Sequence, residues 1–164
     1  GGIAFKSGGD AGAYIQISGT NTYAGPTSFR GTNLKIVDDA TLGRGKVTSE
    51  SGQIYYDGHA NAVISNAFDV TSRLTFRNAT AELHGPVKAG TFRLYKPATI
   101  GVSNVVASRV QSESSNEIKA LYDDTVLTVG EDDQDTAVSC RLSDGTGRLS
   151  LVKQGANRVQ LYGR

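Results

Sequence analysis

Hydrophobic and polar residues alternate along most of this chain. Apolar side chains recur at every second position, as at Ile15 and Ile17 or at Leu34 and Ile36. Such alternation is typical of β-strands with one buried face, because successive side chains point to opposite sides. The predicted inward positions are Ile15/Ile17, Leu34/Ile36, Ile54/Tyr56, Leu74/Phe76, Ala81/Leu83, Phe92/Leu94, Ile118/Ala120, Leu127/Val129, Val138/Cys140/Leu142, Leu149/Leu151 and Val159/Leu161.

The segment from Ser114 to Tyr122 fits a helix as well as a strand. Ile118, Leu121 and Tyr122 would share one face of a helix, but polar residues that favour turns flank the segment on both sides. We predict a strand here. With short apolar runs bounded mostly by Gly, Asn, Asp or Ser elsewhere, the sequence predicts an all-β protein.

Two all-β architectures are compatible with this pattern. A sandwich would join its strands by tight hairpins, and Asp57-Gly58 and Asp144-Gly145 are suitable turn pairs. A solenoid would stack short strands in successive coils and leave weak internal similarity. Residues 3–19 resemble residues 151–163: each has Lys two residues before Gly, then an apolar-Gln-apolar triplet and a second Gly. This similarity favours the solenoid.

Composition sets the size and excludes some partners. The 164 residues are enough for one domain, 1–164, and contain 20 Gly but only three Pro. The formal net charge is +1 and no basic cluster stands out, so nothing favours a nucleic-acid partner. No stretch is apolar enough to span a membrane. Because Met is absent, we interpret the chain as a fragment or a processed piece of a longer repeat protein.

One segment resembles a known family. Residues 15–27 read Ile-Gln-Ile-Ser-Gly-Thr-Asn-Thr-Tyr-Ala-Gly-Pro-Thr, followed by Gly31-Thr32-Asn33-Leu34-Lys35-Ile36. With the strand-like Ala40-Thr41-Leu42, the region from Gly2 to Leu42 resembles the autotransporter-associated β-strand repeat of bacterial surface proteins. Between Asn61 and Asp144 only the spacing of the predicted strands agrees with that repeat. The Gly8–Gly12 segment is longer than the family pattern.

The resemblance implies a right-handed parallel β-helix. In such a fold Ile15 and Ile17 would point inward, and the residues after them would form a structural corner. Gly adopts a positive φ without steric strain. The side chains of Asn and Thr can bond to neighbouring backbone groups or stack between coils, and Pro favours a turn. The predicted corner residues are Gly19, Asn21, Thr22, Tyr23, Gly25 and Pro26.

Residues 131–135 form the densest acidic cluster. Asp132, Asp133 and Asp135 are weak candidates for a calcium site or for a catalytic carboxylate pair. An EF-hand would need its mid-loop Gly and a Glu at the twelfth position, and neither is present. Acidic pairs also follow other apolar runs, at Asp38-Asp39 and at Asp123-Asp124. We therefore predict a solvated turn and no metal or cofactor.

The remaining reactive residue types favour structural roles. Gly8–Gly12 fits neither a calcium nonapeptide nor a phosphate loop, and we interpret it as a flexible loop. His59 and His84 stand alone in sequence beside Gly residues, which predicts surface or turn positions. Cys140 is in phase with Val138 and Leu142, which predicts a small core residue. No catalytic motif is visible.

Two hypotheses for function follow. The first is an extracellular structural or adhesive module of a bacterial surface or secreted protein, without enzymatic activity. The alternative is a β-helix that binds or cleaves carbohydrate, such as part of a phage tailspike or a polysaccharide lyase. In both cases the partners would be a host surface or a polysaccharide. Neighbouring copies or flanking repeats would pair with the terminal strands end to end, because a solenoid exposes unpaired edges there.

Overall fold

A computed structural model describes residues 1–6, 13–38 and 40–162, and within these ranges the chain forms strands and no helix. Alternating burial along the strands, such as that of Gln53–Asp57, matches the alternation of the sequence. The strands are β1 (Ile3–Lys6), β2 (Tyr14–Ile17), β3 (Thr27–Arg30), β4 (Asn33–Val37), β5 (Val47–Ser49), β6 (Gln53–Asp57), β7 (Ala60–Ile64), β8 (Phe68–Leu83), β9 (Val87–Val102), β10 (Asn104–Gln111), β11 (Glu117–Ala120), β12 (Thr125–Val129), β13 (Thr136–Val138), β14 (Arg141–Ser143), β15 (Leu149–Lys153) and β16 (Val159–Leu161).

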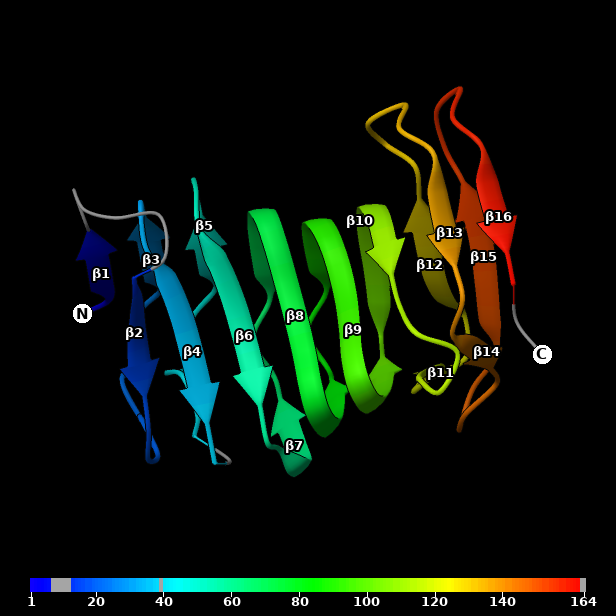
Figure 1. Cartoon of the computed structure of the whole chain (residues 1–164). Helices are drawn as coiled ribbons and strands as arrows, with labels where there is room; N and C mark the ends of the chain where they lie inside the picture. Colours follow the sequence, from blue (N-terminus) through cyan, green and yellow to red (C-terminus); the bar gives the residue numbers. More distant parts are fainter. Residues whose placement is uncertain (7–12, 39, 163–164) are drawn as a thin grey trace.

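The strands stack as a parallel β-solenoid, which confirms the predicted fold class. Each strand pairs in parallel with the equivalent strand of the next coil, where a coil is one circuit of the chain around the axis. One coil takes between 18 residues, from Val87 to Val105, and 24 residues, from Ile3 to Thr27. Figure 1 shows the resulting row of strands, with β1 at one end and β16 at the other.

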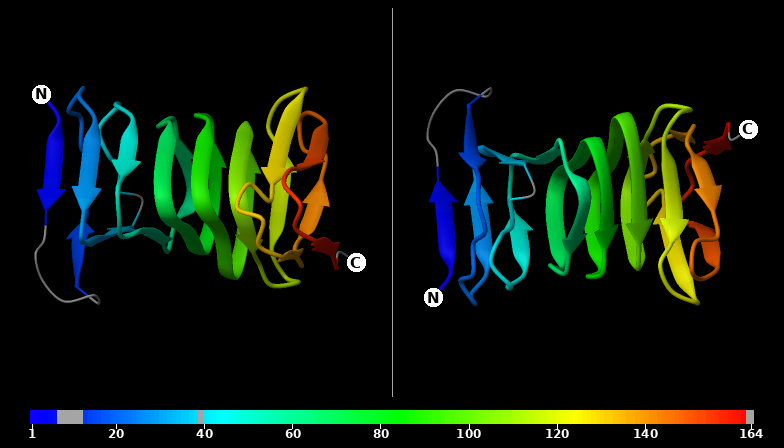
Figure 2. Two further views of the ribbon diagram at one scale, coloured as in Figure 1. Left: turned by 90° about the horizontal axis from the view of Figure 1, so that it is seen from above. Right: turned by 90° about the horizontal axis from the view of Figure 1, so that it is seen from below.

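Three faces run along the solenoid. The views in Figure 2 show the same row of strands from above and from below. The first face is β1, β3, β5, the starts of β8, β9 and β10, then β12 and β15. The second face is β2, β4, β6, residues 73–77 of β8, residues 91–95 of β9 and the end of β10. The third face is β7, residues 79–83 of β8, residues 98–102 of β9, β11 and β14.

The core consists of side chains stacked from coil to coil. On the second face, Tyr56, Phe76 and Phe92 are almost fully buried. The rings of Tyr56 and Phe76 stack with centroids 5.3 Å apart, and those of Phe76 and Phe92 lie 5.7 Å apart. Because parallel pairing in register places equivalent residues one above another, the alternation in each strand becomes a continuous apolar column.

At the C-terminal end, Leu151 and Leu161 stack on the buried residues Leu127 and Val138, as inward positions should, but they are not buried themselves. Leu151 is 36% exposed and Leu161 is 58% exposed, whereas their counterparts in central coils are buried. Both residues lie in β15 and β16, strands paired on one side only. An inward side chain there lacks the layer of neighbours that the following coil provides in the middle of the solenoid.

The ambiguous segment 114–122 forms a strand only in its middle part, β11. Residues 114 and 115 form a turn, Leu121 is buried and Tyr122 is exposed. The two similar sequence segments, 3–19 and 151–163, contain the strands β1 with β2 and β15 with β16, at opposite ends of the molecule (Figure 1). In the part of the chain that the structure describes, no helix is long and apolar enough to cross a bilayer.

Candidate functional site

The segment after β2 links neighbouring coils. Gly19 has a φ of 73°, a region that suits a residue without a Cβ. Asn21 donates from its side-chain amide to the carbonyl oxygen of Thr41 (2.8 Å), and its backbone N–H donates to Thr41 Oγ1 (3.0 Å). Tyr23 packs its ring close to Gly43, where a Cβ would collide with it. These contacts serve the architecture.

Backbone hydrogen bonds tie the end of this segment to β1 and the residues before it. The backbone N–H of Gly25 donates to the carbonyl oxygen of Gly1 (3.1 Å), and Pro26 accepts from the N–H of Ile3 (2.9 Å). Thr22 is exposed. The Gly8–Gly12 loop, Asp39 and Gly163, to which the sequence analysis gave roles, lie outside the described residues.

The acidic residues of the loop between β12 and β13 bond to separate partners. Asp132 Oδ2 accepts from Arg109 Nε (3.2 Å), and Asp133 Oδ1 accepts from the N–H of Ala156 (2.7 Å). Asp135 accepts from the backbone N–H of Arg158 (2.8 Å) and from its guanidinium (3.2 Å). The backbone bond, followed by the guanidinium, holds the pKa of Asp135 below its usual value. These carboxylates therefore join adjacent coils.

No group of three acidic, His or Cys side chains within the described ranges is arranged to hold a metal ion. Each of the three weak candidates, Asp132, Asp133 and Asp135, is an acceptor for N–H groups that point at different oxygen atoms. A calcium ion would have to replace these donors with six to eight oxygen ligands. The prediction that the loop binds no metal awaits the test given below.

His59 lies in the turn between β6 and β7, one of the two predicted positions, but it is buried and not at the surface. It is 1% exposed, and its Nε2–H donates to the carbonyl oxygen of Ile36 (3.0 Å). Its ring meets that of Tyr56 edge to face, with centroids 5.2 Å apart. The turn at Gly58, with a φ of 78°, directs the chain inward, so His59 fills the corner between the second and third faces.

Cys140 and His84 lie in different surroundings. Cys140 is a buried core residue, as predicted, and burial raises the pKa of its thiol. His84 is half-buried and lies between two polar partners: Nε2 is 3.0 Å from Glu82 Oε2, and Nδ1 contacts the hydroxyl of Tyr122. Because Tyr122 is 38 residues further along the chain, sequence spacing alone could not find this cluster.

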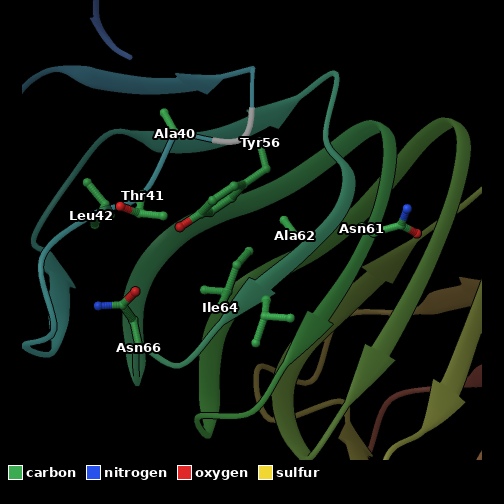
Figure 3. A pocket seen from close by; sticks show the side chains of 9 residues that line it. Ala40, Thr41, Leu42, Tyr56, Asn61, Ala62, Ile64 and Asn66 are labelled. Carbon is green, nitrogen blue, oxygen red and sulfur yellow. The ribbon is translucent and has the colours of Figure 1, made fainter. Parts of the chain in front are cut away.

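A pocket of about 300 Å³ lies beside Tyr56, between the Ala40–Leu42 segment and β7. Figure 3 shows the Tyr56 ring crossing this pocket between Thr41 and Ile64. Burial raises the pKa of Tyr56, so its hydroxyl stays neutral. Asn66 uses its amide to bond the carbonyl oxygens of Gly43 (2.6 Å) and Gly45 (2.8 Å). The pocket is therefore mainly a packing defect at a corner, and it brings no charged groups together.

The tyrosine groove is a depression of about 320 Å³ on the outer side of the second face. Its described lining residues come from β2, β4, β6 and β8, four consecutive coils, and point outward because their strand neighbours Leu34, Ile54 and Tyr56 fill the core. The groove thus extends about 14 Å along the axis at a strand spacing of about 4.8 Å. It is lined by Tyr14, Asn33, Lys35, Gln53, Tyr55, Asp57 and Arg77.

A network of hydrogen bonds fixes the amide groups of the tyrosine groove. Asn33 Oδ1 accepts from the backbone N–H of Gln53 (2.9 Å). Gln53 Oε1 accepts from the hydroxyl of Tyr55 (2.5 Å) and from a guanidinium nitrogen of Arg73 (3.4 Å). The ring of Tyr55 is therefore anchored at its polar end.

Charged groups lie beside these amides. Asp57 has a carboxylate oxygen 3.3 Å from Lys35 Nζ and another 3.6 Å from Arg77 Nε. Lys35 also lies 5.8 Å from the centre of the Tyr14 ring, within cation–π range. The groove therefore offers aromatic surface, fixed amides and a paired carboxylate in one elongated site, an arrangement suited to a ligand with many polar groups.

Sequence reasoning missed this groove. The tyrosines are scattered along the chain. In the one pair adjacent in sequence, Tyr55 points outward to the groove and Tyr56 points into the core. A usable signal exists in the spacing: Asn33, Gln53 and Arg73 stand 20 residues apart and occupy one outward column. That signal becomes readable only when the length of each coil is known.

Comparison with family models, with curated proteins and with solved structures finds no match to this chain. The resemblance of residues 2–42 to the autotransporter-associated repeat therefore stays a prediction from the sequence. The solenoid itself and the tyrosine groove are the findings from which a function can be argued.

Proposed function

We propose that this chain is a rod-shaped adhesive module that binds a carbohydrate chain along its tyrosine groove without cleaving it. The observation that carries the proposal is the convergence of Tyr14 and Tyr55 with the amides of Asn33 and Gln53 across three consecutive coils. A groove that runs along the axis suits an elongated ligand better than a single small group.

The residue types of the groove support a sugar ligand. Tyrosine combines an apolar ring with a polar hydroxyl, so it can cover the C–H face of a sugar ring and bond its hydroxyl groups. Asn and Gln amides each provide donors and acceptors, as a ligand with many hydroxyl groups requires. Tyr14 is 57% exposed and available for such contact.

Binding fits the groove better than cleavage. Glycoside hydrolysis ordinarily uses two carboxyl groups about 5–9.5 Å apart. Asp57 is the one carboxylate among the described lining residues of the groove, and it is paired with both Lys35 and Arg77. The alternative function, a carbohydrate-cleaving β-helix of the tailspike or lyase type, would need a second acidic group at this site.

The proposed location is extracellular, on a bacterial surface or in a secreted protein. This part of the proposal rests on the sequence resemblance of residues 2–42, and especially on the corner from Gly19 to Pro26. A solenoid supports an adhesive role because its stacked coils hold a long binding surface rigid.

A glycan array combined with a reducing-sugar assay tests the proposal. We expect binding to one class of polysaccharide and no release of reducing ends. Tyr55→Ala should weaken binding at least tenfold, whereas Tyr122→Ala, which removes a tyrosine 47% exposed outside the groove, should leave it unchanged. Circular dichroism should show both variants folded.

Three results would contradict the proposal. If the protein binds no glycan on the array, the proposal that its ligand is a carbohydrate is refuted. Equal losses in the Tyr55 and Tyr122 variants would place the ligand elsewhere. Release of reducing ends by the wild-type protein would favour the enzymatic alternative.

A further inference from the structure

Three covered polar atoms lie together on the outer side of β8, next to the tyrosine groove. They are Arg73 Nε, Thr75 Oγ1 and Arg77 Nε, and among the described residues none of them has a hydrogen-bond partner. Arg77 Nε does face a carboxylate oxygen of Asp57 at 3.6 Å, so Arg73 Nε and the Thr75 hydroxyl are the two atoms without a charged or polar partner. The three residues alternate with the core residues Leu74 and Phe76, so they share the outward side of one strand. Unpaired buried polar groups are rare, so Arg73 Nε and the Thr75 hydroxyl need a partner that the chain does not supply, either water or an anion of a ligand.

Thr75 lies at the centre of this cluster. Its side chain is on the outward side, yet it is only 1% exposed because neighbouring long side chains cover it. Register places Tyr55 beside it on β6 and Arg93 beside it on β9. The guanidinium of Arg93 lies 4.8 Å from the centre of the Tyr95 ring, which supports it from one side.

Positive charge exceeds negative charge around Thr75. Arg73, Arg77 and Arg93 surround the position, and Asp57 is the carboxylate that the structure pairs with Arg77. Guanidinium groups bind carboxylates and sulfates through two parallel N–H bonds. A hydroxyl between them can donate a further bond to the same anion.

We propose that Arg73, Thr75, Arg77 and Arg93 form a subsite for the anionic group of an acidic glycan, a carboxylate or a sulfate. The inference rests on the proposed glycan-binding function and names its ligand class. Neutral parts of the sugar chain occupy the tyrosine groove, and the anionic substituent lies over β8, one strand spacing of about 4.8 Å from Tyr55 on β6. Because Thr75 is covered, the proposal requires the arginine side chains to change rotamer when the anion binds.

An acidic glycan fits this surface better than a nucleic acid does. Asp57 lies inside the groove, where its carboxylate accepts bonds from the hydroxyls of the neutral sugar units proposed to lie there. A nucleic acid has a phosphate at every unit, so a strand in the groove would place phosphates against Asp57. Nucleic-acid binding depends on neutralising many closely spaced phosphates. The chain as a whole has a net charge of only +1.

Four polymers separate these ligand classes in a binding experiment: polygalacturonate, a sulfated galactan, a neutral galactan and single-stranded oligo-dT. Surface plasmon resonance would compare their affinities at low and at raised salt. We expect both acidic polymers to bind at least tenfold more tightly than the neutral galactan, and we expect added salt to reduce that ratio.

Matched variants assign the preference to the subsite. Arg93→Gln and Thr75→Val should bring the ratio of acidic to neutral affinity close to one. Arg30→Gln, at an exposed arginine on the first face, should not change the ratio. Because the Thr75 hydroxyl is unpaired in the free protein, Thr75→Val should not lower the melting temperature, so its effect on affinity reports ligand contact.

Three other results of the binding experiment would refute one or both proposals. Equal affinity for acidic and neutral galactans, still lost in Tyr55→Ala, would refute the anionic subsite and keep the glycan-binding function. Tighter binding of oligo-dT than of either acidic polymer would assign this face to nucleic acid. Absence of binding to all three glycans would refute both proposals.

Discussion

Buried polar side chains join one coil to the next at the corners of this solenoid. Asn116 is 1% exposed; its Oδ1 accepts from the N–H of Ala98 and its Nδ2 donates to the carbonyl oxygen of Leu94, both at 3.0 Å. Between those two groups β9 bends at Lys96, whose φ is 59°. A side chain from the following coil therefore supplies bonds at the bend.

At the residue scale, replacing Asn116 with Leu should destabilise the protein by about 2–4 kcal/mol. The substitution leaves the N–H of Ala98 and the carbonyl oxygen of Leu94 without their partner, and each buried unpaired group costs about 1–3 kcal/mol. Urea denaturation measures the loss.

Asn104→Ala is the matched control for this experiment. Asn104 also bonds the next coil, through Oδ1 and the N–H of Val126 (3.0 Å), but the site is exposed and water can replace the bond. The control should lose less than about 1 kcal/mol. Equal losses in the two variants would show that burial at the Asn116 corner has no special importance.

At the element scale, β8 and β9 differ from the other strands in length. Each has 16 residues and passes continuously from the first face to the third. Register shifts between Val70 and Arg73 and between Arg77 and Ala79 allow the bends. On both sides of β8 and β9 the faces are formed by separate, shorter strands, and the acidic loop between β12 and β13 projects beyond the ends of these strands (Figure 1).

Chelator treatment tests the interpretation of that acidic loop. We expect EDTA to leave the melting temperature unchanged within about 1 °C, because Asp132, Asp133 and Asp135 already accept bonds from N–H groups. A calcium ion present at 100 times its dissociation constant would add about 2.7 kcal/mol. For a chain of this size that corresponds to a fall of roughly 5–10 °C on chelation, which would contradict the prediction.

At the scale of the whole molecule, the two ends differ from the middle. β15 is exposed along most of its length, and among the described strands β16 pairs with β13 alone, whereas the long central strands β8 and β9 have parallel partners on both sides. Val152, Leu161 and Tyr162 are exposed apolar or aromatic residues at this end. An unpaired parallel edge with apolar side chains is a template for another strand.

We therefore predict concentration-dependent association of the chain through this end. The double variant Val152→Lys and Leu161→Lys should suppress it, because two charges would be buried at the contact. Val159 is left unchanged because it packs against the core. Sedimentation velocity over a range of concentrations measures the association.

Val63→Lys is the control for the association experiment, because Val63 is 61% exposed but lies on β7, on the side of the solenoid. That variant should associate as the wild type does. A strictly monomeric wild-type protein at high concentration would refute the prediction, and equal suppression by the Val63 variant would place the contact on the side.

Much of the fold was predictable because alternation is a local property. The pairs Leu34/Ile36, Ile54/Tyr56 and Leu74/Phe76 face inward whatever lies above or below them, since neighbouring side chains of a strand must point to opposite sides. The burial of Cys140 was predictable for the same reason, because Cys140 alternates in step with the apolar residues Val138 and Leu142. The solenoid was inferred from repetition, whereas the inward positions needed only the alternation itself.

The sequence by itself thus determined the strand class and the core-facing positions of the middle coils. Only the tertiary structure decided that His59 is buried, that Leu161 is exposed, and that Tyr14 and Tyr55 line one groove. The physical reason is the varying length of the coils, 18 to 24 residues, which sets the outward residues that stack together. That length depends on corners closed by side chains from neighbouring coils, such as Asn21 and Asn116, and these contacts exist only after the coils have stacked.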